Sequence, residues 1–190
     1  MSVSVRKPMT VEAFLSWEER QEARWEFDGL GPVAMTGATN AHEAAGGNLR
    51  SLLLLALRGT QCAVRGPTLK IESSGRIRYP DAFVFCSAAR RDQTVIADPV
   101  VVFEVLSEST SRIDRIEKLR EYQATPSIRR YVILEQDAVA ATVYLKQDGA
   151  WTVSVLTDDA VLAMPEVEAD IPLLAIYADV ELPSADAVEG

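Results

Sequence analysis

The stretch Val100-Val101-Val102-Phe103-Glu104-Val105-Leu106 decides the fold. Six apolar residues around a single carboxylate are typical of a buried strand that other elements cover on both faces. At such a position an ionised Glu104 is costly unless a cation compensates its charge. Two interpretations carry about equal weight: a buried ion pair with a nearby arginine, or a carboxylate with a chemical role. The strand itself is expected over residues 99–106.

The patterning on either side of this strand predicts further helices and strands in one domain. Helices are expected at 10–23, 40–58, 112–124 and 173–177, a turn at 107–111, and strands at 24–28, 32–35, 61–65, 68–72, 76–86, 130–135, 138–145 and 151–156. This order predicts an α/β (α+β) fold, a mixed β-sheet flanked by helices with additional C-terminal β-hairpins. No linker rich in Pro, Gly or Ser divides the chain, so we expect a single domain over 1–190 with a flexible tail at about 183–190.

Local signals predict how the two N-terminal helices begin and where one is irregular. Thr10 and Asn40 are expected as N-caps, and Gly59 follows the end of the second helix. The pair Gly46-Gly47 lies inside that helix, where each glycine costs about 1 kcal/mol relative to alanine. The pair therefore predicts either an interruption of the helix or a very close packing contact.

The charge balance is acidic but uneven. The 190 residues carry a net charge of −9, which argues against a protein that coats nucleic acid generally. Residues 135–190 alone carry −11, so residues 1–134 carry +2, and residues 58–91 hold seven basic side chains against two acidic ones. A locally basic face is therefore compatible with the low overall charge.

The cysteines and the apolar runs indicate a cytoplasmic protein. Cys62 and Cys86 each lie singly in an expected strand, so we expect buried thiols in a reducing compartment. No apolar run approaches the roughly 20 residues of a membrane helix. Arg6 and Lys7 are not followed by the apolar stretch of a signal peptide.

Several enzyme classes are excluded by missing motifs. The chain has one histidine and no Gly-x-Ser-x-Gly, Cys-x-x-Cys, His-Glu-x-x-His, Gly-x-x-x-x-Gly-Lys-Ser/Thr or Gly-x-Gly-x-x-Gly motif. These absences argue against a serine hydrolase, a zinc site and the common nucleotide folds. The histidine, His42, is expected as a structural partner, and its place near a helix N-terminus disfavours protonation.

Three further charged residues have both a structural and a chemical interpretation. Asp81 follows Tyr79-Pro80, and turn chemistry favours a turn residue over a site residue by about two to one. Glu26 fits the polar face of an edge strand. Lys118 is expected either in surface ion pairs along its helix or pointing back at the end of the Glu104 strand.

Together these residues resemble a known family, the Uma-type "putative restriction endonucleases" of the PD-(D/E)XK nuclease superfamily. The resemblance runs from about residue 9 to 182. It rests on the order and spacing of Arg24-Trp25-Glu26-Phe27-Asp28-Gly29, Ala41-His42-Glu43, Tyr79-Pro80-Asp81, Asp98 through Ser107, Ser109-Thr110, Asp114, Lys118, Tyr122, Pro126-Ser127 and Tyr131-Val132.

The resemblance implies a restriction-endonuclease-like core and a nuclease site. Asp81 takes the position of the aspartate and Glu104 that of the second acid, and Glu26 matches an additional acid. The superfamily's lysine lies two residues after the second acid, where this chain has Leu106. In this family the lysine stands instead on the following helix, at Lys118.

The implied activity is metal-dependent hydrolysis of phosphodiester bonds in DNA. Asp81, Glu104 and Glu26 supply hard oxygen ligands for Mg²⁺ or Mn²⁺, and Lys118 supplies a point charge at the reacting phosphate. A homodimer would provide the two sites that cutting both strands requires. We retain two alternatives: a catalytically inactive DNA-binding or protein-interaction module with the same fold, and a small α/β protein whose acids are all ion-paired.

Two geometric expectations follow. Asp81 and Glu104 should lie on neighbouring strands with both carboxylates within reach of one cation. The basic stretch at 58–91 and the arginines of the following helix, Arg112, Arg115 and Arg120, should border the cleft.

Overall fold

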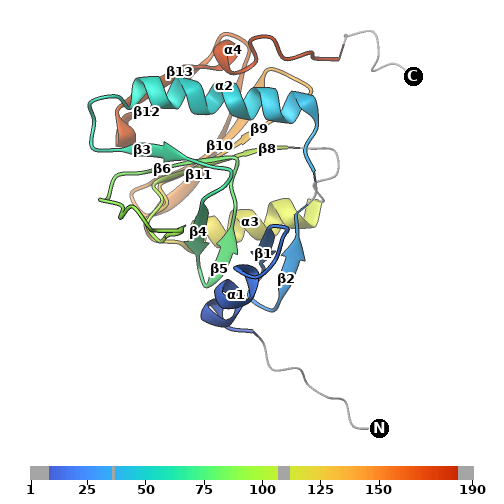
Figure 1. Ribbon diagram of the computed structural model, residues 1–190. Coiled ribbons are helices and arrows are strands. Elements are labelled where there is room, and N and C mark those ends of the chain that lie inside the picture. The colour runs from blue at the N-terminus through green and yellow to red at the C-terminus, as the bar shows by residue number, and fades with distance from the viewer. Residues whose placement is uncertain (1–8, 36, 107–111, 184–190) are drawn as a thin grey trace.

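The computed structural model describes residues 9–35, 37–106 and 112–183, which form a six-stranded, a five-stranded and a two-stranded β-sheet with four α-helices (Figure 1). The elements in chain order are α1 (Val11–Glu18), β1 (Trp25–Phe27), β2 (Pro32–Ala34), α2 (Asn40–Ala56), β3 (Ala63–Arg65), β4 (Lys70–Ser73), β5 (Arg76–Arg78), β6 (Ala82–Phe85), β7 (Val95–Ile96), β8 (Val101–Val105), α3 (Arg112–Ala124), β9 (Arg130–Leu134), β10 (Ala140–Gln147), β11 (Ala150–Thr157), β12 (Val161–Met164), the 3-10 helix η1 (Pro165–Val167), β13 (Ala169–Pro172) and α4 (Leu173–Ile176). The expected turn at 107–111 and most of the expected tail lie outside the described residues.

The large sheet has six strands in the order β11-β10-β9-β8-β6-β3. Strands β8 and β9 pair in parallel, joined by the segment that contains α3, and the other neighbours pair antiparallel. The mixed sheet with flanking helices is therefore confirmed. Strand β8, the stretch that opened the sequence analysis, lies inside this sheet and is buried along its whole length.

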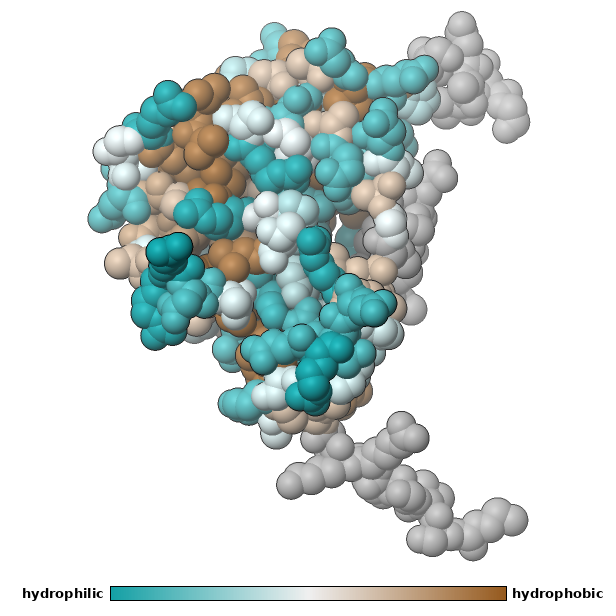
Figure 2. Space-filling view, viewed as in Figure 1, coloured by the Kyte–Doolittle hydropathy of each residue, from teal (hydrophilic) through white to brown (hydrophobic). Residues whose placement is uncertain are grey.

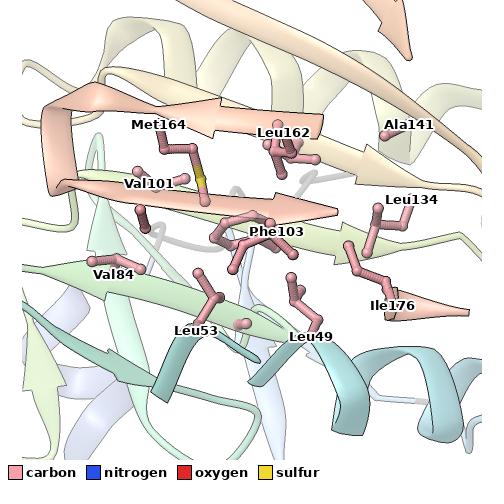
Figure 3. Packing of buried hydrophobic residues seen from close by; sticks show 14 of the residues in the cluster. Leu49, Leu53, Val84, Val101, Phe103, Leu134, Ala141, Leu162, Met164 and Ile176 are labelled. Carbon is pink, nitrogen blue, oxygen red and sulfur yellow. The ribbon is translucent and has the colours of Figure 1, made fainter. Parts of the chain in front are cut away.

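Both faces of the large sheet are covered, as the apolar pattern of β8 predicts. Helix α2, the pair β12–β13 and α4 cover one face, where Leu49, Leu53 and Phe103 pack with Leu162 and Ile176 (Figure 3). Helix α3 and parts of the small sheet cover the opposite face. The outer side of α2 exposes Leu54 and Leu55, and hydrophobic surface appears over this helix in Figure 2.

The small sheet has five short strands in the order β2-β1-β5-β4-β7 and lies beside the N-terminal helix α1 (Figure 1). Phe14 of α1 packs with Phe27 and Ile77 to form its own apolar cluster. The sequence analysis predicted one sheet. The difference arises at Tyr79-Pro80, where the expected strand 76–86 divides into β5 of the small sheet and β6 of the large sheet. Pro80 has no N–H for a ladder and restricts the residue before it, so one continuous strand cannot form.

The helix ends follow the expected signals only in part. The Thr10 side chain accepts a hydrogen bond from the Ala13 N–H, as predicted, but α1 ends at Glu18. Helix α2 is capped by Thr39 and not by Asn40. It runs unbroken through Gly46-Gly47, so the expected interruption is wrong; an added Cβ at Gly46 would lie 3.1 Å from the Nη1 of Arg50 on the same helix and 3.9 Å from Val105.

The cysteine prediction is wrong. Cys62 and Cys86 form a disulfide across β3 and β6. The register pairs Ala63 with Phe85, so the two cysteines lie directly opposite each other just beyond this pair. A cysteine alone in each strand reveals nothing of that register, and the cysteines therefore give no argument for a reducing compartment. None of the helices in the described ranges has the length and apolar character needed to cross a bilayer.

Candidate active site

The two carboxylates singled out in the sequence meet where β6 begins and β8 ends. Ala82 pairs with Phe103, so extending the register by one residue places Asp81 opposite Glu104. The first half of the geometric expectation, neighbouring strands, is confirmed. Glu104 lies on the face of the sheet that α3 covers, and Asp81 lies between α2 and β8.

Asp81 is held by three residues of two elements, α2 and β8. Its Oδ2 accepts a hydrogen bond of 2.7 Å from the Val105 N–H, and its Oδ1 lies 2.8 Å from the Nε2 of His42 in the first turn of α2. The Arg50 Nη1 donates to the Asp81 backbone oxygen at 3.2 Å. The carboxylate thus bonds a neighbouring strand and helix, which differs from the turn role that sequence chemistry favoured.

The contact with Asp81 reverses one expectation for His42. The hydrogen bond to the Asp81 carboxylate raises the pKa of His42 and outweighs the opposing effect of burial. Helix position alone had suggested that protonation is disfavoured. A direct carboxylate partner at hydrogen-bond distance acts more strongly than the partial charge at a helix end.

Glu104 is nearly buried, with 9% of its surface exposed. The Tyr122 hydroxyl donates to its Oε1 at 2.9 Å, and the Lys118 Nζ lies 3.2 Å from the same oxygen. The pKa of Glu104 is raised to about 7, chiefly by burial and also by the Asp81 and Glu26 carboxylates, against the lowering effect of Lys118 and Tyr122. The cation beside Glu104 is thus a lysine of α3, where one sequence interpretation expected an arginine.

Lys118 occupies the place that the second of its two sequence interpretations predicted. Its side chain is 13% exposed and reaches back to the end of the Glu104 strand. Its Nζ also lies 4.0 Å from the Glu26 Oε1, so one ammonium group stands near two of the predicted acids. The side chain of Asp114, its expected surface partner, lies outside the described residues.

Glu26 is not on an edge strand, because β1 lies between β2 and β5. Both of its carboxylate oxygens are hydrogen-bonded. Oε1 accepts from the Tyr79 N–H at 3.1 Å, and Oε2 accepts from the Arg78 Nη1 at 3.0 Å. Glu26 therefore fixes the backbone immediately before Pro80-Asp81.

A buried ion pair that the sequence does not predict lies behind Glu26. Arg78 is 3% exposed, and its Nε and Nη2 donate to the carboxylate of Glu121 in α3. Burial opposes the charge of Arg78, but the hydrogen bonds to Glu121 prevail and raise its pKa. Spacing along the chain gives no signal for this pair, since 43 residues separate its members.

Gly66 is a second residue that the sequence analysis did not use. It has φ +123°, and an added Cβ would lie 2.6 Å from the backbone oxygen of Asp81. A side chain at this position would collide with the backbone that carries the aspartate. The glycine thus permits the turn before β4 to pack directly on the candidate site.

The predicted metal ligands differ in how well they suit a cation. Asp81 and Glu104 stand opposite each other in the extended register of β6 and β8, both have the hard carboxylate oxygens that Mg²⁺ prefers, and the Asp81 charge raises the pKa of Glu104. Glu26 has both oxygens occupied by Arg78 and the Tyr79 backbone. Within residues 9–35, 37–106 and 112–183, no three His, Cys, Asp or Glu side chains are already arranged around one point. Binding of a cation by three such side chains would therefore require them to rearrange.

The expected basic border is smaller than the sequence count indicates. Lys70 and Arg78, two of the seven basic residues at 58–91, are buried in ion pairs with acids and cannot contact a polyanion. Arg115 and Arg120 of α3 are exposed, and the side chain of Arg112 lies outside the described residues.

Comparisons with known proteins agree with this architecture. Two proteins of Synechocystis sp., both described as uncharacterized, are similar: one is 35% identical over 150 residues, 76% of this chain and 78% of its own length, and the other is 27% identical over 162 residues, 82% and 92%. A crystal structure of "a putative nuclease belonging to DUF820" from Anabaena variabilis matches with a TM-score of 0.74 at 15% identity, over 90% of this chain and 98% of that one, which shows the fold. The sequence model described as "Putative restriction endonuclease" matches residues 11–175, and the chain therefore belongs to that family, Uma2.

Proposed function

We propose that this protein is a metal-dependent endonuclease that hydrolyses phosphodiester bonds in DNA. The observation that carries the proposal is the meeting of Asp81, Glu104 and Lys118 at the ends of two neighbouring central strands. An acid pair with a lysine at a strand end can hold a divalent cation and stabilise negative charge at a reacting phosphate. Membership of the restriction endonuclease family supports the same activity.

Asp81 and Glu104 would hold Mg²⁺ or Mn²⁺, with Glu26 as the third acid predicted from the sequence. The ion, when bound, lowers the pKa of a water molecule and offsets negative charge on the phosphoryl oxygens. The Val105 N–H orients the Asp81 carboxylate, and the Tyr122 hydroxyl orients that of Glu104. Both acids are thus held by partners whose positions the large sheet and α3 determine.

Lys118 would contribute the positive charge at the reacting phosphate. Its Nζ lies 3.2 Å from Glu104, so it stands beside the proposed cation position. In the transition state the phosphoryl group carries more concentrated negative charge than in the ground state, and a fixed ammonium stabilises this state selectively. Leu106 cannot supply that charge, which leaves the role to the lysine of α3.

A second candidate function is a binding module that keeps the fold without cleaving DNA. Two observations favour it: the net charge of −9, and the burial of Lys70 and Arg78 away from any polyanion. In that case Lys118 would serve only to neutralise Glu104 within the fold. Metal binding separates the two functions, because a nuclease site binds Mn²⁺ and an ion-paired relic does not.

The test is cleavage of supercoiled plasmid and of branched DNA in the presence of Mg²⁺ or Mn²⁺. We expect nicking or linearisation by the wild-type protein and a loss of about 10²–10³-fold in rate for Asp81→Asn, Glu104→Gln and Lys118→Met. Glu117→Gln on the exposed side of α3 and Lys146→Met on β10 are the matched controls and should retain full activity. Sedimentation of the active protein tests the expected homodimer.

Absence of cleavage from a folded protein that also binds neither metal would establish the second function instead. Full activity in Lys118→Met would remove the lysine from the mechanism. Full activity in both acid variants would reject this site altogether.

A further inference from the structure

We infer that strand β11 is the interface of a symmetric homodimer, in which it pairs antiparallel with β11 of a second copy and joins the two large sheets into one. Such a dimer does not depend on nuclease activity, because β11 lies outside the candidate active site. Three features of the strand point to this partner: its unpaired backbone groups, its lack of protection against pairing, and its self-complementary side chains.

The backbone of β11 has hydrogen-bonding groups without a partner strand. β11 is the last strand of the large sheet, and no described residue pairs with its outer side. One position past the β10–β11 pairs, the Asp158 N–H donates to the Val139 oxygen at 3.1 Å. Hydrogen-bonded positions alternate in antiparallel pairs, so the even-numbered residues of β11 bond β10. The N–H and C=O groups of Trp151, Val153 and Val155 therefore point outward along the free edge.

The other outer strands of the two larger sheets are protected against pairing. β3, at the far end of the large sheet, has three residues, ends on Arg65 and is followed by Gly66-Pro67. In the small sheet, β2 has three residues and begins with Pro32, and β7 has only two residues. Shortness, proline and charge are the usual means of preventing edge-to-edge pairing. β11 has eight residues and contains no proline, glycine or charged side chain.

The side chains of β11 suit a second copy of the same strand. Val153 and Val155 have 62% and 66% of their surface exposed. Val153 lies opposite Tyr144 on β10, whose ring stacks on Tyr131 in the apolar cluster that α3 covers. A twofold axis at Ser154 places Val153 of one copy opposite Val155 of the other. The apolar layer then continues across the interface.

Charge and symmetry also favour an identical strand as the partner. The chain carries a net charge of −9, so two copies repel each other over much of their surfaces. β11 is neutral, and two copies can approach along it without bringing like charges together. In an antiparallel pair of identical strands, the twofold axis sets every outward N–H and C=O group against outward groups of the other copy.

The assembly closes at two copies. Pairing through β11 leaves β3 at both ends of the combined sheet, and the protected edge of β3 cannot add a third copy. A single strand pair is a small contact beside the roughly 1,200–2,000 Å² of a standard specific interface. We therefore expect a dimer that dissociates on dilution.

The two candidate active sites of this dimer are independent of each other. β9 and β10 lie between β11 and β8, the strand that carries Glu104. Neighbouring strands are about 4.8 Å apart, so the two Glu104 residues would be separated by a distance on the order of 30 Å. Neither copy then contributes a side chain to the site of the other.

Sedimentation equilibrium of the full chain between about 1 and 200 μM tests the dimer. We expect the wild type to shift from the mass of one chain to that of two. Val153→Lys and Val155→Pro should keep the mass of one chain, with association weakened at least about tenfold. The proline removes an outward N–H and leaves the bonds of β11 to β10 intact. Leu54→Lys is the matched control, because it places the same charge at an exposed apolar residue of α2, and it should associate as the wild type does.

Amide hydrogen exchange followed by NMR provides the second measurement. The N–H groups of Val153 and Val155 should exchange slowly at high protein concentration and quickly after dilution. The N–H of Ser154 bonds β10 and should stay protected at both concentrations. This alternation distinguishes strand pairing from a contact made by side chains alone.

Four results would overturn the inference. They are a wild type with the mass of one chain at every concentration, a dimer that persists in folded Val153→Lys, a dimer that Leu54→Lys disrupts while Val153→Lys does not, and continuous growth beyond two copies. Circular dichroism and urea denaturation establish which variants are folded. If Val155→Pro fails to fold, Val153→Lys and the exchange of the wild-type amides still decide the question.

The dimer and the proposed function fail separately. A dimer through β11 that cleaves no DNA supports the inference and rejects the nuclease activity. Cleavage by a wild type that has the mass of one chain rejects the dimer alone.

Discussion

The large and the small sheet bury charge in different proportions, although the large sheet has buried ion pairs of its own, Arg130 with Glu166 and Glu104 with Lys118. The large sheet packs apolar residues on both faces, with Phe103 and Val102 of β8 fully buried on opposite sides. The small sheet buries ion pairs, including Arg78 with Glu121 and Lys70 with Glu18. In the small sheet these ion pairs surround a small apolar cluster of Phe14, Phe27 and Ile77, whereas the two apolar clusters on the faces of the large sheet are far larger.

The small sheet fixes the segment that leads into Asp81. The Tyr79 hydroxyl donates to Glu18, and the Tyr79 N–H donates to Glu26. Both acids are in turn paired with buried cations, Lys70 and Arg78. Buried ion pairs add little to stability over apolar residues of the same volume, but they hold a group in one place. Asp81 lies at the junction of the two sheets and depends on both.

The largest effect on stability is expected from Arg78→Met. Removing the guanidinium takes away the nearest cation of both Glu121 and Glu26 and leaves only Arg76 at 3.6 Å and Lys118 at 4.0 Å, and breaking a buried pair in this way costs about 3–5 kcal/mol. Urea denaturation of the folded variant measures the loss. The double variant Arg78→Met with Glu121→Gln should recover part of it, because one of the two acids then carries no charge. A single variant as stable as the wild type would show that the small sheet does not depend on its ion pairs.

A loss of stability of similar or smaller size is expected when a buried residue of α2, the helix that covers one face of the large sheet, is truncated. Leu53 on α2 is fully buried and its neighbour Leu54 is 56% exposed. Leu53→Ala should lower the free energy of unfolding by about 2–5 kcal/mol, because it removes apolar contacts and leaves a cavity. Leu54→Ala should change it by about 0.5 kcal/mol or less. Equal losses for both variants would mean that α2 is packed differently from the arrangement in Figure 3.

Sequence reasoning succeeded where one segment carries its own signal. Strand β8, helix α3 and the hairpin around Asp148-Gly149 follow from local periodicity and turn residues, and the structure has all three. The two residues of that hairpin turn have positive φ angles of 50° and 82°, which suit this dipeptide.

The same reasoning failed where distant segments decide the outcome. The separation of β5 from β6, the pairing of Cys62 with Cys86 and the contact of Arg78 with Glu121 each depend on a neighbour far along the chain. The pair β12–β13 was missed because each strand has only four residues, too few for a clear alternation. For the site, Asp81, Glu104 and Lys118 were predicted to meet, whereas the contact of His42 with Asp81 required the fold.

A smaller effect on the free energy of unfolding is expected from the titration of Glu104. This residue belongs to the large sheet, and charged groups surround its buried carboxyl. Its pKa rises from the ordinary value of 4.5 to about 7, mainly through burial. The folded state therefore binds this proton more tightly than the unfolded state does. The stabilisation is complete below about pH 4.5 and is lost as the pH rises towards about 7, by up to about 3 kcal/mol.

The measurement compares the wild type with Glu104→Gln across this pH range, in the presence of a chelator so that no metal is bound. Other carboxylates titrate in both proteins, so only the difference between the two curves reports Glu104. The wild type should lose stability relative to the variant as the pH rises. Parallel curves would mean that Lys118 and Tyr122 compensate the buried charge fully.

The smallest effect on stability is expected from an exposed ion pair, which provides the contrast to the buried pairs of the small sheet. Arg115 on α3 lies 3.9 Å from Glu135, with 46% and 30% of the two side chains exposed. Solvent screens such a pair, so Arg115→Ala should change the free energy of unfolding by about 0.5 kcal/mol or less.

If the proposed function holds, the same variant should bind DNA more weakly. The slope of log affinity against log salt concentration should fall by about one, because one phosphate contact is lost. Arg129→Ala is the matched control, since this exposed arginine lies next to Val100, at the end of β8 far from Glu104. If both variants weaken DNA binding equally, the position of the arginine does not matter for DNA affinity. If Arg115→Ala lowers the free energy of unfolding by several kcal/mol, surface charges hold α3 in place rather than Tyr122 and its apolar neighbours.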